Sequence, residues 1–183
     1  MFEIIEENEA GVKLLKNFLF KDMRGTFCKT FSEKDFLKNG FLFQPKENFY
    51  SISKKFVLRG MHFQISPNAE CKIIKCIKGS VFDVAIDLRK TSSSFGDWIG
   101  IELSSVKNNA IVIPEGFAHG FQTMTSNCEM LYLHTEDYNK SSEGAINALD
   151  PMINIKWPKP ITMRSTRDIS HAMLTENFKG IEL

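Results

Sequence analysis

Short apolar runs separated by turn residues dominate the middle of the chain. They lie at Lys72–Ile77, Val81–Asp87, Trp98–Leu103, Ala110–Ile113, Gly120–Met124 and Glu129–His134. Between them stand segments such as Lys78-Gly79, Ser92–Gly96 and Pro114–Gly116. Apolar runs of this length with such punctuation are typical of strands in an all-β sandwich or barrel. The pattern therefore predicts an all-β fold.

The run at Val81–Asp87 alternates between two kinds of face. Val81, Asp83, Ala85 and Asp87 share one face, and Phe82, Val84 and Ile86 share the other. Because successive side chains of a strand point to opposite sides, one face is apolar and the other mixed. A mixed face is expected where a sheet lines a polar pocket.

Helical signals are sparse. Ser32–Asn39 is expected to form one short helix, because Ser32 suits the N-cap, Asp35 follows three residues later and Gly40 suits the stop. Ser165–His171 is expected to form another helical turn. The polar stretch after Trp157-Pro158 is expected to wrap the surface of the domain.

Composition limits the possible classes of protein. The chain has 183 residues, of which 43% are hydrophobic and 25% charged, so residues 1–183 are expected to form a single globular domain. Its 23 basic residues nearly balance 22 acidic ones, which gives no basic footprint for nucleic acid. No apolar run approaches the roughly 20 residues of a membrane span. Four cysteines without CxxC spacing, and no signal peptide at the start, predict reduced thiols in a cytoplasmic protein.

Two segments have the character of a site. Phe56–Gln64 reads FVLRGMHFQ and places Arg59 and His62 near a glycine. Ile113–Phe121 reads IPEGFAHGF, and the glycines beside His119 are expected to let the backbone approach a ligand closely.

These segments resemble the dTDP-4-dehydrorhamnose 3,5-epimerase family, together with VFDVAIDLRK, SFGDWIG and MLY at Val81–Lys90, Ser94–Gly100 and Met130–Tyr132. The resemblance runs from about Phe20 to Asp168. It implies a cupin-like jelly-roll β-barrel without a metal, usually a homodimer, in which the N-terminal part of one subunit contributes to the site of its partner.

The resemblance also implies roles for individual residues. His62 matches the general base, Asp168 the carboxylate that orients it, Tyr132 the general acid on the opposite face of the sugar, and Lys72 the lysine near the keto oxygen. The substrate-binding positions that it implies are Arg24 (lent by the partner subunit), Phe20, Glu47, Arg59, His119 and Glu143.

The chemistry explains these residue types. Removing a hydrogen from carbon 3 or carbon 5, beside a carbon-4 ketone, leaves an enolate. A neutral histidine is a suitable base because its unperturbed pKa is about 6.5. Lys72 would stabilise the enolate oxygen, and Tyr132 would return a proton from the other face. No cofactor is expected, because the substrate already carries the ketone.

Without the resemblance, these residues have ordinary interpretations. His62 would be a hydrogen-bonded structural histidine, Tyr132 a core residue and Lys72 a solvated lysine. Asp168 would be a helix cap or a surface carboxylate, and Arg59 would pair with a carboxylate. His134 and His171 match no site of the family and are expected to be structural.

The residues expected to contact the nucleotide base differ from those usual in the family. The usual QDNHS becomes Glu47 to Ser51, so that Glu47 and Phe49 replace a glutamine and an asparagine that contact thymine in the family. A carboxylate only accepts hydrogen bonds, and guanine offers an N–H and an NH₂ side by side. We therefore hypothesise a GDP-linked, or less favourably CDP-linked, 4-keto sugar, either a 6-deoxyhexose or a heptose.

Three function classes follow. The first is an epimerase of a nucleotide-linked 4-keto sugar in surface-polysaccharide synthesis, acting at carbon 3, carbon 5 or both. The second is a non-catalytic module that binds sugar nucleotides, which would need neither His62 nor Tyr132. The third is a metal-dependent cupin oxygenase, which is disfavoured because the H-x-H pair of such sites is absent: Phe63 and Gln64 follow His62. We therefore expect no metal.

Overall fold

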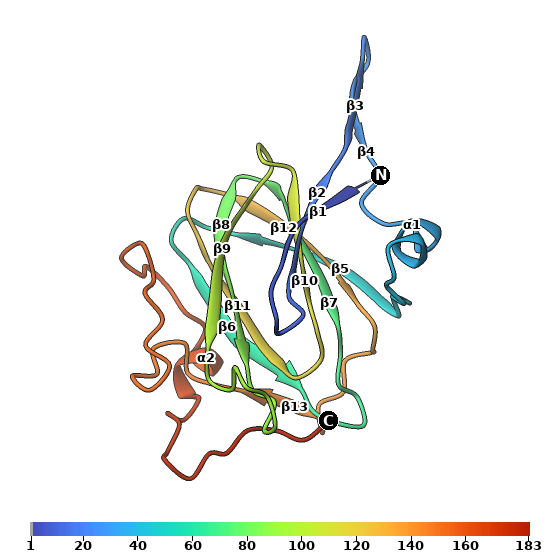
Figure 1. The fold of residues 1–183 in the computed structure, drawn as a ribbon. Helices are drawn as coiled ribbons and strands as arrows, with labels where there is room; N and C mark the ends of the chain where they lie inside the picture. Colours follow the sequence, from blue (N-terminus) through green and yellow to red (C-terminus); the bar gives the residue numbers. More distant parts are fainter. Residues whose placement is uncertain (1) are drawn as a thin grey trace.

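The computed structural model describes residues 2–183, and two antiparallel sheets face each other in it (Figure 1). The six-stranded sheet has the order β1-β2-β10-β7-β12-β5, and the five-stranded sheet has the order β13-β6-β11-β8-β9. Strands β3 and β4 form a separate hairpin. The two facing sheets confirm the predicted all-β, jelly-roll type of fold.

The first sheet contains β1 (Phe2–Glu7), β2 (Lys13–Asn17), β5 (Glu47–Ser53), β7 (Lys72–Lys78), β10 (Asn109–Ile113) and β12 (Cys128–His134). The second contains β6 (Leu58–Gln64), β8 (Ser80–Asp87), β9 (Trp98–Ser104), β11 (Phe117–Thr123) and β13 (Glu143–Ala145). The hairpin is β3 (Leu19–Asp22) and β4 (Gly25–Cys28), and the helices are α1 (Glu33–Lys38) and α2 (Thr166–Ser170).

The core lies between the two sheets. Buried apolar side chains from both sheets meet there, among them Ile74, Val81, Ala85, Phe121 and Met130.

The C-terminal segment covers the outer face of the second sheet. Val84 and Ile86 of β8 pack there against Ile153, and Phe82 meets Trp157 edge to face at 6.1 Å. The two faces of β8 therefore explain its alternation. The mixed face with Asp83 points into the barrel, while the apolar face is covered by later chain.

The predicted strands and both short helices are confirmed. Strand β11 begins at Phe117 instead of Gly120, because its pairing with β8 already starts at Phe117 opposite Asp87. Ser32 is the N-cap of α1, although its side chain makes no capping bond, and Ser165 caps α2 by accepting a hydrogen bond from the Asp168 N–H at 3.0 Å.

The β3–β4 hairpin extends away from the barrel (Figure 1). Its apolar side chains are exposed, with Phe20 at 60% and Phe27 at 62%. The exposure matters for the site, because the family resemblance implies that Phe20 and Arg24 bind substrate.

Among residues 2–183, no helix is long and apolar enough to span a membrane.

Candidate active site

Two adjoining cavities open between the sheets, with volumes of about 280 Å³ and 460 Å³. Both are lined by Phe49, His62, His119 and Tyr132. His62 comes from β6 in one sheet and Tyr132 from β12 in the other. The structure therefore brings the expected base and the expected acid to one space, from opposite walls.

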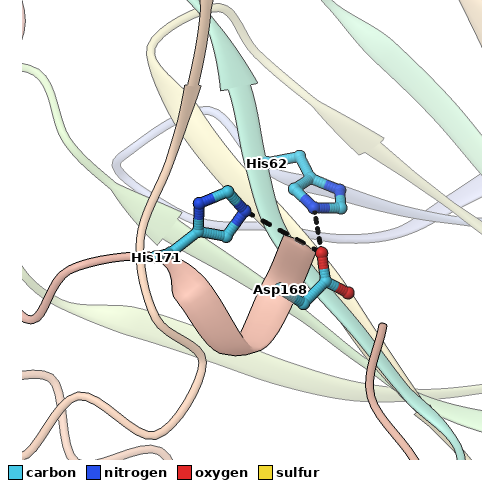
Figure 2. A group of neighbouring side chains, drawn as sticks. All are labelled: His62, Asp168 and His171. Atoms are coloured by element: carbon cyan, nitrogen blue, oxygen red, sulfur yellow. Dashed lines mark hydrogen bonds and ion pairs between the residues drawn. The ribbon is translucent and has the colours of Figure 1, made fainter. Parts of the chain in front are cut away.

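His62 forms a dyad with Asp168 (Figure 2). The Nε2 atom of His62 lies 2.8 Å from Oδ1 of Asp168. Because an ionised carboxylate only accepts hydrogen bonds, Nε2 of the neutral ring carries the hydrogen. Nδ1 is then the only ring nitrogen with a lone pair.

Helix α2 holds Asp168 in place. The Asp168 N–H donates to Ser165 Oγ, and its second oxygen, Oδ2, accepts from the Gly60 N–H at 3.3 Å. Burial opposes its ionisation, but the hydrogen bonds from His62 and Gly60 outweigh burial and hold the pKa of Asp168 below its ordinary value. Asp168 is therefore ionised at neutral pH and presents a negative charge to His62.

Tyr132 is buried on the opposite wall. Its hydroxyl lies 3.0 Å from Ser51 Oγ, and its ring stacks on Phe49 with the centroids 4.8 Å apart. Burial raises the pKa of the phenol well above its ordinary value. Tyr132 is therefore protonated at neutral pH and has a proton to give.

Lys72 belongs to a buried ionic cluster beside the dyad. Its ammonium lies 3.1 Å from Glu70, and Glu70 also accepts from Nδ1 of His134 at 2.7 Å. Burial opposes the charge on Glu70, but His134 and Lys72 hold its pKa below the ordinary value. Lys72 also donates to the His62 carbonyl at 3.3 Å. Lys72 is thus a buried, paired lysine and not a solvated one.

His119 is paired with a second buried carboxyl group. Its Nε2 lies 2.9 Å from Oδ2 of Asp83, which is completely buried. Burial lowers the pKa of His119 and raises the pKa of Asp83, so both shifts favour an uncharged pair. His119 therefore presents a neutral imidazole to the cavities.

The other expected binding residues lie around the cavity mouths. Arg59 donates to Ser53 Oγ at 2.9 Å, and not to a carboxylate. Glu143 pairs with Arg167 and accepts a hydrogen bond from Tyr138 at 3.0 Å. Glu47 and Glu143 both line the smaller cavity.

The expected close approach of backbone to a ligand at the glycines beside His119 stays a prediction, and Gly120 lines the larger cavity. Gly120 also serves the packing of two strands. A Cβ atom on Gly120 would lie 2.6 Å from the Arg59 carbonyl oxygen, and one on Gly60 would lie 2.6 Å from Gly120 Cα. Gly60 and Gly120 therefore let β6 and β11 approach each other where the register shifts.

Arg24 and Phe20 do not join this site within one chain. They line a surface hollow of their own hairpin, where Arg24 pairs with Asp22 at 2.6 Å. The side chain of Arg24 is 90% exposed.

Several residues of the site were missed from the sequence. Ser51, Glu70 and Asp83 touch the expected residues directly, and His134, expected to be purely structural, lines the smaller cavity. The strand alternation that placed Asp83 on a mixed face was a usable signal for one of them. No signal of that kind linked Glu70 to His134, because Glu70 lies in the loop before β7 and His134 lies on β12.

The fold and the cavity define a cupin-like barrel with a histidine–carboxylate dyad facing a buried phenol. Residues 7–176 match the family model of dTDP-4-dehydrorhamnose 3,5-epimerase. The chain belongs to this family and is an isomerase of the epimerase type.

Individual relatives agree. The chain is 40% identical to a dTDP-4-dehydrorhamnose 3,5-epimerase of Salmonella typhimurium, over 96% of this chain and 100% of that one. It is similar to the structure of the Bacillus anthracis enzyme with TDP and pyrophosphate bound, with a TM-score of 0.91 and 32% identity over 95% and 100% of the two chains. It is also similar to a dTDP-6-deoxy-D-glucose-3,5-epimerase of Legionella pneumophila in complex with dTDP-4-keto-L-rhamnose, with a TM-score of 0.88 and 33% identity over 94% and 93%.

Proposed function

We propose that this chain inverts carbon 3 and carbon 5 of a dTDP-linked 4-keto-6-deoxy sugar, with His62 as base and Tyr132 as acid. One observation carries the mechanism: the two side chains reach the same cavities from opposite sheets. Inversion requires a proton to leave one face of the sugar and to return on the other. A base and an acid on opposite walls meet this requirement.

The base step uses the free nitrogen of His62. With Nε2–H bonded to Asp168, Nδ1 takes the proton from the carbon beside the ketone. The ring then becomes an imidazolium, which the ionised Asp168 stabilises. Proton transfer by a well-placed group of this kind contributes typically ~10²–10⁴-fold to the rate.

The enolate oxygen is stabilised by positive charge already in place. Lys72 supplies this charge in our proposal, because it lines the smaller cavity together with His62 and Glu70 fixes its ammonium. His119 lies on the same wall as His62 and offers a neutral hydrogen-bonding group to the sugar. No reducing or oxidising group is needed, because the ketone in the substrate makes the neighbouring C–H acidic.

The acid step uses Tyr132. Its raised pKa keeps the proton on oxygen until the enolate carbon accepts it. Ser51 holds the hydroxyl in place. A phenylalanine at this position would leave the base intact, so proton removal would continue while delivery from the opposite face would fail.

The nucleotide is proposed to be dTDP, since relatives along nearly the whole chain are named for dTDP sugars. Glu47 lines the smaller cavity, and the competing prediction of a GDP-linked sugar rests on this residue. Titration calorimetry of the protein with dTDP and with GDP separates the two, and tighter binding of GDP would overturn the nucleotide we propose. A Glu47→Gln variant should lose GDP binding only if Glu47 contacts the base.

A second copy of the chain is proposed to complete the site. Phe20 and Arg24 lie on a projecting hairpin with exposed apolar side chains, away from their own cavities. In a homodimer, this hairpin would cover the cavity mouth of the partner and bring Arg24 to the diphosphate.

The deciding experiment is incubation of the protein with a dTDP-4-keto-6-deoxy sugar in D₂O, followed by NMR. We expect deuterium at carbon 3 and carbon 5, and no exchange with His62→Asn. A module that only binds sugar nucleotides would give no exchange with the unaltered protein. Deuterium at one carbon alone would reduce the activity to that of a mono-epimerase.

A further inference from the structure

A second imidazole lies beside the dyad and has no part in the mechanism above. His171 follows α2 as its C-cap, and its Nε2 lies 3.9 Å from the same Oδ1 of Asp168 that binds His62 (Figure 2). Within residues 2–183, the buried His171 Nε2 has no hydrogen-bond partner. A buried nitrogen without a partner is uncommon and calls for an explanation.

The three side chains match the donor set of a transition-metal site. One ligand atom each from His62, Asp168 and His171 lie within 4.8 Å of one another. Zinc binds imidazole nitrogen and carboxylate oxygen at about 2.0–2.2 Å, so two ligands of one ion lie at most about 4 Å apart. A small movement of His171 would bring the three ligand atoms to these distances. His171 is the C-cap of α2, so the helix itself does not have to move.

The charge around this group also suits a cation. The neighbouring Arg167 is already paired with Glu143, so it does not compensate the Asp168 carboxylate. Two neutral imidazoles and one carboxylate would leave coordination positions open toward the cavity that His62 and Asp168 line.

We propose that His62, Asp168 and His171 form an inhibitory site for Zn²⁺ or a similar divalent transition metal. It is not a cofactor site, because the ion would occupy the dyad. The inhibitory effect rests on the proposed function of His62, whereas the binding itself does not.

Metal binding would turn off the base through a change of tautomer. In the free protein, Nε2 of His62 carries the hydrogen and Nδ1 has the lone pair. An ion can bind Nε2 only through a lone pair on that nitrogen, so the hydrogen must move from Nε2 to Nδ1. The ring neither gains nor loses a proton in this change. Nδ1 can then no longer accept a proton from the substrate.

The binding test uses ZnCl₂ calorimetry and the visible d–d absorption of added Co²⁺ on the full-length protein, with a reductant present. We expect one ion per chain, and at least about tenfold weaker binding with His171→Gln. Even a residue that only hydrogen-bonds to a metal ligand contributes about tenfold or more to metal affinity. His134→Gln is the matched control, because His134 is also a buried imidazole paired with a carboxylate. Burial raises the pKa of Cys71 and Cys76 to about 12, so these thiols compete weakly for the ion.

The inhibition test uses exchange in D₂O with and without ZnCl₂. Zinc should stop exchange by the unaltered protein, EDTA should restore it, and His171→Gln should exchange in both conditions. In ¹H–¹⁵N spectra, zinc should move the His62 proton from Nε2 to Nδ1. Equal zinc binding by His171→Gln and the unaltered protein would overturn the site. If no sugar exchanges at all, the proposed function fails while calorimetry and Co²⁺ absorption still decide the metal site.

Discussion

The side chains of the cavity wall and those of the β3–β4 hairpin differ in burial and in pairing. In the wall, Lys72, Glu70 and Asp83 are buried, and each has a partner of complementary chemistry. In the hairpin, Phe20 is largely exposed and Arg24 has only its neighbour Asp22. Burying a charge is costly unless it is paired, while exposed apolar groups are stabilised only by a covering surface. The charged and polar groups of the wall thus find their partners within one chain, whereas the apolar side chains of the hairpin have no surface that covers them among the described residues.

The largest expected effect is the loss of deuterium exchange on substitution of Asp168 in the cavity wall. Asp168→Asn can donate to His62 Nε2 and so move the ring hydrogen to Nδ1, where the base must be free. We expect deuterium exchange to fall by about 10²–10⁴-fold.

The matched control for that change is Asp150→Asn. Asp150 is equally buried but accepts hydrogen bonds from loop backbone, such as the Met152 N–H at 2.8 Å, and lines neither catalytic cavity. Asp150→Asn should keep its exchange rate. If both variants exchange equally fast, Asp168 does not serve the base.

The next effect concerns the hairpin. Arg24→Ala should raise KM by about tenfold or more, because a hydrogen bond to a charged group contributes roughly 1.5–3 kcal/mol. Stability should hardly change, since the side chain is exposed. Lys21→Ala, in the same hairpin, controls for general loss of positive charge, and an unchanged KM in Arg24→Ala would remove the hairpin from the site.

Mixed dimers sharpen the comparison further. Chains with Arg24→Ala and chains with His62→Asn are each impaired alone. If the hairpin of one chain serves the partner, a mixed dimer contains one site with both residues intact. Mixing and refolding the two should therefore restore exchange. Failure to restore it in a verified mixed dimer would contradict the sharing.

A third effect concerns delivery of the proton. Tyr132→Phe should reduce inversion more than it reduces deuterium exchange, because His62 and not Tyr132 removes the proton. NMR of one reaction in D₂O gives both rates. Equal loss of exchange and inversion would mean that Tyr132 acts in the first step as well.

The remaining effects concern stability. Glu70→Gln leaves Lys72 buried without a charged partner and should lower the free energy of unfolding by roughly 3–5 kcal/mol at pH 7. Because the folded pKa of Glu70 is depressed, its contribution is full above the unfolded value near 4.5 and is lost as pH falls through the folded value. The difference between the variant and the unaltered protein should therefore shrink below pH 4.5 in urea titrations.

Glu129→Gln is the surface control for this change. Glu129 pairs with Lys78 at 2.9 Å, but the lysine is 61% exposed. Such a pair contributes about 0–1 kcal/mol. An equal loss in both variants would show that burial of the Glu70 pair has no particular importance.

Some of the fold could be predicted because its signals are local. Period-two alternation in Val81–Asp87 and turn residues between runs indicated strands, and Ser165 indicated the start of α2. Strand β5 was not predicted, because Glu47–Ser53 is an edge strand with mostly polar or exposed residues. The hairpin was missed for a similar reason, since most of its residues are exposed.

The sequence by itself determined the class of fold, the family and the candidate residues His62, Lys72, Tyr132 and Asp168. Motif order and strand periodicity are properties of neighbouring residues, so they can be read along the chain. Only the tertiary structure decided which groups meet: Ser51 with Tyr132, Glu70 with His134, and His171 with the dyad. Each of these contacts joins residues from separate segments of the chain. The protonation of these residues depends on burial, which no single segment specifies.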